Sequence, residues 1–201
     1  RGDIMPMPGA GDPYFYEWYV GLENVIEMLN PDSGIRCVIF QHDEYDTIDD
    51  VVVENNNGDT QMCYQVKHNI ETAEPRSLTF GTMIDASNSK KCLFEAIFRG
   101  WKQVSATSKA LIKPVLFTNR KIHNRRASRH FNGEKYSAYP IDQFVSKMQT
   151  IIAATEAGTN LVFTDKALET QWKELCSVLS SVDPNELIDF LEYLQIKGSV
   201  P

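Results

Sequence analysis

Hydrophobic residues recur at helical spacing near the start of the chain. Between residues 14 and 29 they fall three or four positions apart, with glutamates between them. Asp12 and Pro13 stand where a helix cap and first turn would be, and Asn30 and Pro31 stand where the helix would stop. The pattern predicts an amphipathic helix with an apolar side formed by Phe15, Trp18, Tyr19, Leu22, Val25, Ile26 and Leu29.

Short runs typical of β-strands follow this helix. They cover residues 36–41, 50–54 and 61–68, and the pair Asn57 and Gly58 between the second and third runs marks a hairpin turn. We therefore expect the second and third strands to be antiparallel neighbours.

The rest of the chain alternates once more between helix and strand and then becomes mainly helical. The pattern predicts a loop over residues 71–80, a helix over 89–105 and a buried strand over 113–118. Helices are expected from about residue 141, the last of them over 185–196. This order predicts an α/β fold with a mixed central sheet flanked by helices and a helical C-terminal part.

The composition fits a single domain. Of the 201 residues, 42% are hydrophobic and 23% are charged, so we expect residues 1–201 to form one domain that residues 141–201 complete. No apolar run approaches the roughly 18 residues of a membrane span, and residues 1–11 lack the features of a secretory signal. A cytoplasmic protein without a membrane partner is therefore expected. The cysteines are scattered without a CxxC pair, which indicates free thiols.

For binding to nucleic acid, the distribution of charge along the chain matters more than the net charge. A formal net charge of -7 opposes binding to a polyanion. A basic segment nevertheless runs from residue 120 to 135, with only Glu134 as an acid, and we expect it to form a loop or helix that contacts phosphate. An ordinary solvated face explains the same residues without a ligand. The candidate nucleic-acid-binding residues are Arg120, Lys121, Arg125, Arg126 and Arg129.

Polar residues interrupt the apolar pattern of the second and third strands. Gln65 and Lys67 are two positions apart and therefore project from one face of the same strand. A strand lysine is rarely buried unless it is paired or functional. The hairpin places Asp50, at the head of the neighbouring strand, across from this pair. One carboxylate and one amide oxygen suffice for Mg²⁺, which takes its other ligands from water and phosphate.

Two acids compete for this position. Strand alternation sends Asp49 and Asp50 to opposite faces, and we prefer Asp50 because it directly precedes the valines at 51–53. His68 and the acidic residues at 43–46 lie nearby in the sequence. We interpret His68 first as a hydrogen-bonding group at the end of its strand, and the acidic residues first as part of a solvated loop. A surface hairpin with ordinary polar residues would explain the whole set without any site.

These residues carry a resemblance to a known family. An acid at the head of a strand, a hairpin, and Gln-x-Lys in the next strand resemble the PD-(D/E)xK nuclease superfamily in its QxK variant. More narrowly, residues 49–53 (DDVVV) and 64–68 (YQVKH) resemble the double-stranded DNA nuclease domain of bacterial anti-phage effectors, including those of CBASS antiviral defence systems. The resemblance covers the elements from Tyr14 to about Thr118. Gln65 departs from the usual second acid and removes one negative charge.

The resemblance implies a restriction-endonuclease-like fold and a Mg²⁺-dependent DNA endonuclease, in which Mn²⁺ can substitute. Asp50 and Gln65 would hold the metal, and Lys67 would position the attacking water. Glu17 would be a further catalytic carboxylate, because Gly11, Tyr16 and Glu17 resemble a family pattern of glycine, aromatic residue and glutamine near the helix start. Glu23 and Glu27 remain alternatives to Glu17.

The resemblance also implies regulation from outside this chain. By this resemblance, the chain would be the N-terminal part of a larger protein in which a sensor domain binds a cyclic oligonucleotide and activates DNA cleavage. The chain starts at Arg1 without Met and contains no GxxxxGK[ST] string, in keeping with that expectation. A homo-oligomer through faces around Trp18, Trp101 or Trp172 stays open. So do two competing interpretations: a catalytically silent nucleic-acid-binding or interaction domain, and a nuclease that acts on RNA.

Overall fold

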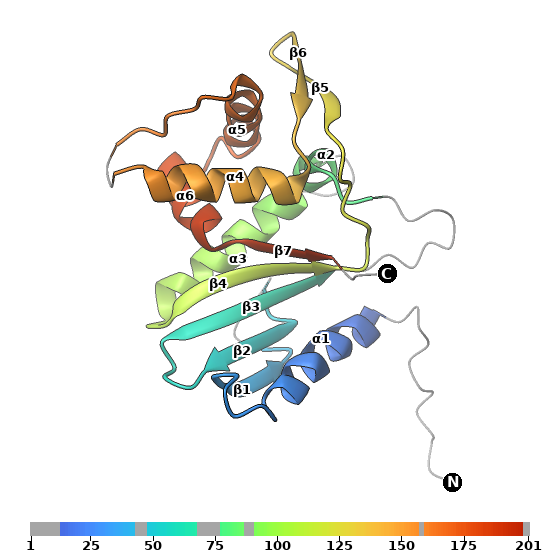
Figure 1. The fold of residues 1–201 in the computed structure, drawn as a ribbon, viewed down its shortest axis with the longest axis vertical. Coiled ribbons are helices and arrows are strands. Elements are labelled where there is room, and N and C mark those ends of the chain that lie inside the picture. The colour runs from blue at the N-terminus through green and yellow to red at the C-terminus, as the bar shows by residue number, and fades with distance from the viewer. Residues whose placement is uncertain (1–12, 43–47, 68–76, 87–90, 157–158, 199–201) are drawn as a thin grey trace.

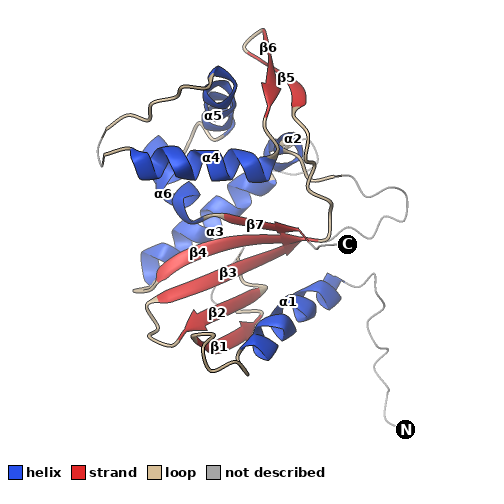
Figure 2. Ribbon diagram, in the orientation of Figure 1, coloured by secondary structure: helices blue, strands red, loops and turns tan. Residues whose placement is uncertain are grey.

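A five-stranded sheet with helices on both of its faces forms the centre of the molecule (Figures 1 and 2). The structure is a computed structural model, and it describes residues 13–42, 48–67, 77–86, 91–156 and 159–198. The predicted α/β class with a mixed central sheet is confirmed.

The sheet combines an antiparallel half with a parallel half. Its order is β1-β2-β3-β4-β7; β1, β2 and β3 are antiparallel neighbours, whereas β3, β4 and β7 run parallel. The first four strands were predicted to within about two residues. The fifth was not, because the last helix was expected to continue to residue 196 and to be followed by a linker. The strand bounds are β1 (Ile35–Phe40), β2 (Val51–Asn55), β3 (Thr60–Lys67), β4 (Leu111–Thr118) and β7 (Gln195–Gly198).

Within the described residues, one helix, α1 (Pro13–Glu27), crosses the first face of the sheet, over β1 to β3 (Figure 1). It packs through a narrow strip around the buried Val20 and Gly21. A Cβ atom on Gly21 would lie 2.0 Å from Cε1 of Phe40, so the close approach of α1 to β1 requires glycine at this position. The helix therefore meets the sheet through small residues.

The large apolar side of this helix, formed by the residues predicted from periodicity, is exposed. Trp18 is 58% exposed and Leu29 is 81% exposed, and the other members of that side are also exposed. The physical reason is that the helix turns the strip at Val20 and Gly21 toward the ring of Phe40 and the sheet, so the large side chains on its other sides project away from the sheet.

The second face of the sheet is covered by a thick layer of helices. Its core contains the fully buried rings of Phe94, Phe98, Phe144 and Phe190, and the ring of Phe190 meets those of Phe94, Phe98 and Trp101. The C-terminal helices thus share one core with the sheet. The helices are α2 (Phe80–Ile84), α3 (Leu93–Thr107), α4 (Ile141–Ala154), α5 (Lys166–Val178) and α6 (Pro184–Tyr193).

Helix boundaries on this face follow local capping chemistry. The carboxylate of Asp165 accepts hydrogen bonds from the backbone N–H groups of Ala167 and Leu168 at the start of α5, and Asp183 caps α6 ahead of Pro184. Within the described ranges, no helix is long and apolar enough to cross a membrane.

Residues 120–126 of the basic segment form the expected loop, whereas the part from residue 127 onward forms a β-hairpin that was not expected. Strands β5 (Ala127–Phe131) and β6 (Glu134–Ala138) pair with each other and project beyond the central sheet (Figure 1). Asn132 and Gly133 have positive φ angles of 49° and 79°, as a tight hairpin turn requires.

Candidate active site

Asp50 and Gln65 meet at the end of β2, as the hairpin predicted. Nε2 of Gln65 donates a hydrogen bond of 2.5 Å to Oδ2 of Asp50, and the backbone N–H of Val66 donates one of 2.5 Å to the same oxygen. Asp50 immediately precedes β2, and its side chain, rather than a backbone carbonyl, accepts the hydrogen bond from the N–H of Val66 in β3. The carboxylate is therefore held in a fixed orientation by β3.

The surroundings of Asp50 change its acidity. Burial is the main reason why the pKa of its carboxyl is raised to about 6. The hydrogen bond from Val66 and the charge of Lys67 lower this pKa, whereas the negative charges of Glu17 and Asp49 raise it. A bound cation would oppose the effect of burial and favour the ionised form.

Glu17 is the acid of α1 that the structure brings to this place. It accepts a hydrogen bond of 3.2 Å from Nε2 of Gln41, whose backbone N–H in turn donates to the carbonyl of Asp50. Glu23 lies further along α1 in a different pocket, and Glu27 accepts from the side chain of Asn30 near the helix end. Of the three glutamates, Glu17 is thus the neighbour of Asp50.

Lys67 ends β3 on the same face as Gln65, but its side chain is exposed. The argument from burial of a strand lysine therefore does not hold. What places Lys67 is the strand register: it stands opposite Thr118, the last residue of β4. Lys67 lines a pocket of about 350 Å³ between the ends of β3 and β4 and the helices α2 and α3.

The buried polar residues of the described chain single out this region. Gln171 bonds to the backbone of Tyr139 at both its N–H and its carbonyl, and Glu174 pairs with Arg129, so both are explained by the fold. The other two are Gln65, at 5% exposure, and Thr118, at 1%. Burial of polar side chains is costly without a partner, and these two stand at the strand ends that form the site.

The predicted nucleic-acid-binding residues divide into two groups. Arg129 forms an ion pair of 2.5 Å with Glu174, and Arg126 lies 3.7 Å above the ring of Tyr139 and 3.6 Å from Asp165. These two attach the hairpin to its neighbours, and we therefore leave them out of the contact surface. Lys121 and Arg125 are exposed, and Arg120 lines the pocket beside Lys67.

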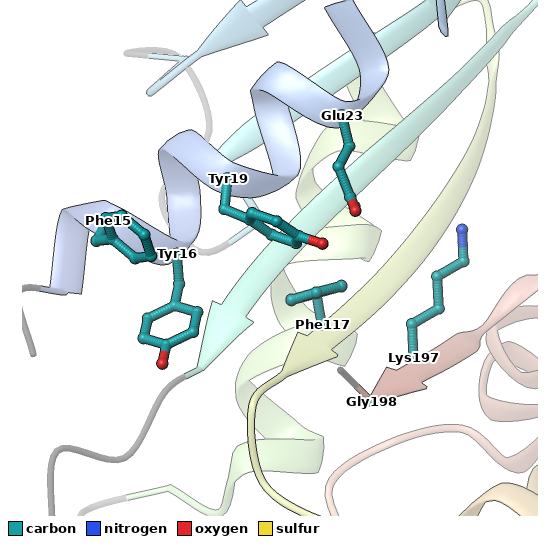
Figure 3. Close-up of a pocket in the computed structure, with 7 residues that line it drawn as sticks. All are labelled: Phe15, Tyr16, Tyr19, Glu23, Phe117, Lys197 and Gly198. Carbon is teal, nitrogen blue, oxygen red and sulfur yellow. The ribbon is translucent and has the colours of Figure 1, made fainter. Parts of the chain in front are cut away.

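A larger pocket of about 750 Å³ lies on the opposite face of the sheet, between α1 and the ends of β4 and β7 (Figure 3). Aromatic rings of Phe15, Tyr16, Tyr19 and Phe117 form most of its wall, and its charged groups are Glu23 and Lys197. A single carboxylate and a single ammonium among rings do not form the acid, amide and lysine set that phosphodiester chemistry needs. The acid and amide predicted from the sequence meet instead at Asp50.

The residues at Asp50 fit a small hard cation. Both described donors to its carboxylate end on Oδ2, which leaves Oδ1 as a ligand; the Gln65 amide presents its Nε2 to the carboxylate, so its oxygen would join a shared cation only after the amide rotates. Glu17 adds a second carboxylate nearby. Within the described residues there is no group of three or more His, Cys, Asp and Glu side chains suited to a metal. The set suits Mg²⁺, which needs few protein ligands, and does not suit zinc.

Some predicted residues cannot be placed, and some placed residues were not predicted. His68, Gly11 and the acidic residues at 43–46 lie outside the described residues. Gln41, Thr118 and Lys91 belong to the region but were missed. Thr118 could have been found from the sequence, because it ends a buried strand predicted to enter the same sheet.

No protein-family model matches this chain, and no curated protein sequence matches it.

Proposed function

We propose that this domain is a Mg²⁺-dependent endonuclease that hydrolyses phosphodiester bonds of double-stranded DNA. The observation that carries the proposal is the Asp50 and Gln65 pair, held at 2.5 Å by side-chain and backbone hydrogen bonds beside Lys67. We further infer a restriction-endonuclease-like arrangement of the sheet. The order of a helix, three antiparallel strands, two helices and a parallel fourth strand supports that inference.

Each residue has a separate role in this proposal. Oδ1 of Asp50 would hold the cation, joined by the amide oxygen of Gln65 once that amide rotates away from Oδ2, and the bound cation would supply charge stabilisation at the scissile phosphate. The Val66 N–H keeps the carboxylate of Asp50 in place before substrate arrives. Lys67 orients water for attack and places a positive charge beside the developing charge of the phosphate. Glu17 accepts a proton or orients water from the side of α1.

We also propose that the exposed cations Lys121 and Arg125 contact the DNA backbone, and that activity is controlled by a sensor domain in the same protein, as in anti-phage effectors. The acidic net charge of -7 makes a local basic surface necessary for binding DNA.

Cleavage of supercoiled plasmid tests the proposal. Wild-type protein should nick or linearise plasmid in Mg²⁺ or Mn²⁺ and should be inactive in EDTA. Lys67→Ala should lower the rate by a factor of about 100 or more, the usual effect of removing one charge-stabilising donor. Lys109→Ala is the matched control, because Lys109 is exposed and precedes β4 at the other end of the sheet.

The other outcomes discriminate between functions. Equal rates for wild type and Lys67→Ala, or cutting without a divalent cation, would overturn the proposed site. Tight DNA binding by a protein that never cuts would indicate a silent binding domain. Faster hydrolysis of a duplex RNA of the same sequence would make the substrate RNA.

A further inference from the structure

The pocket beside Lys67 contains more positive charge than the proposed reaction uses. Lys67, Lys91 and Arg120 contribute three cations to its wall, and Asp85 contributes one acid. The pocket opens at the carboxyl ends of the parallel strands β3 and β4, the place where open α/β sheets usually bind ligands. Its volume of about 350 Å³ is that of a small-molecule site rather than of a single ion.

Arg120 has an unused hydrogen-bond donor at this pocket. Its Nε is buried and has no hydrogen-bond partner in the described part of the chain, and Arg120 forms no ion pair with a described residue. A buried N–H without an acceptor is costly, and because Arg120 lines the pocket, a rotation of its guanidinium toward the pocket would let an acceptor of a ligand satisfy it. This arginine differs from Arg126 and Arg129, whose carboxylate partners belong to the fold.

Thr118 adds a second donor next to this arginine. Its Oγ1 accepts a hydrogen bond of 3.1 Å from the backbone N–H of Arg120, which leaves the hydroxyl proton to be donated elsewhere. Thr118 is 1% exposed and stands opposite Lys67 in the register of β3 and β4. Lys67, Thr118 and Arg120 thus form a row of donors along one pocket wall.

We propose that this pocket binds a second phosphate group of the DNA, next to the phosphate that is cut. Planar guanidinium, ammonium and hydroxyl donors are the groups that recognise phosphate oxygens. The inference rests on the proposed function, because Lys67 borders both the pocket and the Asp50 site. The phosphate belongs either to an internal phosphodiester or to a terminal monoester, and the experiment separates these sources.

The test measures binding rather than cutting. Fluorescence anisotropy in EDTA follows a short labelled duplex against a series of NaCl concentrations. Each lost phosphate contact should reduce the slope of log K against log salt by about 0.9, which near 0.1 M salt corresponds to roughly tenfold weaker binding. Arg120→Gln and Lys91→Gln should both show this change. Lys109→Gln, which also removes one exposed positive charge, should keep the wild-type slope.

Two variants guard against a folding artefact. Lys91 is exposed, so Lys91→Gln should fold normally even if Arg120→Gln does not. Wild-type slopes for both variants, or no duplex binding by the wild type, would overturn the inference. A duplex with a 5′-phosphate that binds wild type tighter than its 5′-hydroxyl counterpart, with the difference lost in Arg120→Gln, would identify a terminal monoester. Equal binding of the two duplexes, with the slope change retained, would identify an internal phosphodiester.

The two proposals can fail separately. If the slope changes as expected but no variant or wild type cuts DNA, the pocket binds phosphate and the nuclease proposal fails. If wild type cuts DNA in a Lys67-dependent manner while the Arg120→Gln slope is unchanged, the nuclease proposal stands and the pocket inference fails.

Discussion

The two faces of the central sheet are covered in very different ways. On one face, helices α2 to α6 surround the fully buried rings of Phe94, Phe144 and Phe190; on the other, α1 touches the sheet through Val20 and Gly21 and leaves Trp18 exposed. The site draws on both layers, because Gln65 and Lys67 project toward the thick layer and Glu17 comes from the thin one. Hydrophobicity of a residue therefore does not tell how much it contributes to stability in this molecule.

The largest expected effect is a difference in stability between aromatic residues of the two faces. Phe190→Ala should lower the free energy of unfolding by about 4 kcal/mol, because it leaves a cavity among Phe94, Phe98 and Trp101. Trp18→Ala should cost less than about 1 kcal/mol, since its contact with the described chain includes one tilted ring pair with Phe40 at 5.8 Å. Urea unfolding measures both values.

Similar losses for these two variants would break the comparison. They would mean that the exposed side of α1 is covered in solution, and the unfolding midpoint of wild type would then depend on protein concentration or on an added partner.

The next effect concerns the site rather than the core. Burial raises the pKa of Asp50 to about 6 from an ordinary value of 3.8, so the folded protein keeps a proton that the unfolded chain has lost. This contribution to stability is complete below about pH 4 and is lost as the pH rises through about 6. Asp50→Asn should therefore be more stable than wild type at about pH 8, by up to about 3 kcal/mol.

Thermal unfolding at two pH values checks the sign. Without divalent cations, the variant should melt several degrees above wild type at alkaline pH, and the gap should close in acid. Added Mg²⁺ should raise the melting temperature of wild type and leave that of Asp50→Asn unchanged. A gap of equal size at both pH values would show that ionisation of Asp50 is not its cause.

The smallest expected effect concerns the packing of α1 against β1. Gly21→Ala places a methyl group against the ring of Phe40 and should cost about 1 to 2 kcal/mol, even though alanine favours a helix over glycine. Because α1 carries Glu17, the same change should lower the rate of plasmid cleavage. Leu22→Ala is the control, since Leu22 is exposed on the same helix and should change neither quantity. Unchanged stability and rate in Gly21→Ala would mean that the ring of Phe40 moves aside.

Much of the fold and of the Asp50 and Gln65 geometry followed from local sequence pattern. A hairpin fixes which residues face each other, so the pairing of the head of β2 with Gln65 needed no knowledge of distant contacts. The α1 helix was also predicted from periodicity. Which side of it packs was not, because that depends on how closely Gly21 lets it approach β1, a property of two elements together.

The parts that were missed depend on distant partners or on a neglected signal. Strand β7 is four residues long and exists because β4 offers it an edge, which no local pattern records. The hairpin of β5 and β6 did carry a signal: Asn132 and Gly133 are the same turn pair that marked the hairpin at Asn57 and Gly58. The run of arginines around it drew the interpretation toward phosphate binding, whereas Arg129 serves an ion pair with Glu174.

The pairing of β4 with β7 has a consequence for the order of folding. Val115 pairs with Gln195, so this edge can close only after the intervening hairpin and helices have found their places. The β2 and β3 hairpin, by contrast, can form early and brings Asp50 to Gln65 by itself. In a nascent chain, Asp50 and Gln65 would thus be paired before the strands around Thr118 have assembled. Partly folded molecules should then lack the finished edge formed by β4 and β7 while already having the Asp50 and Gln65 pair.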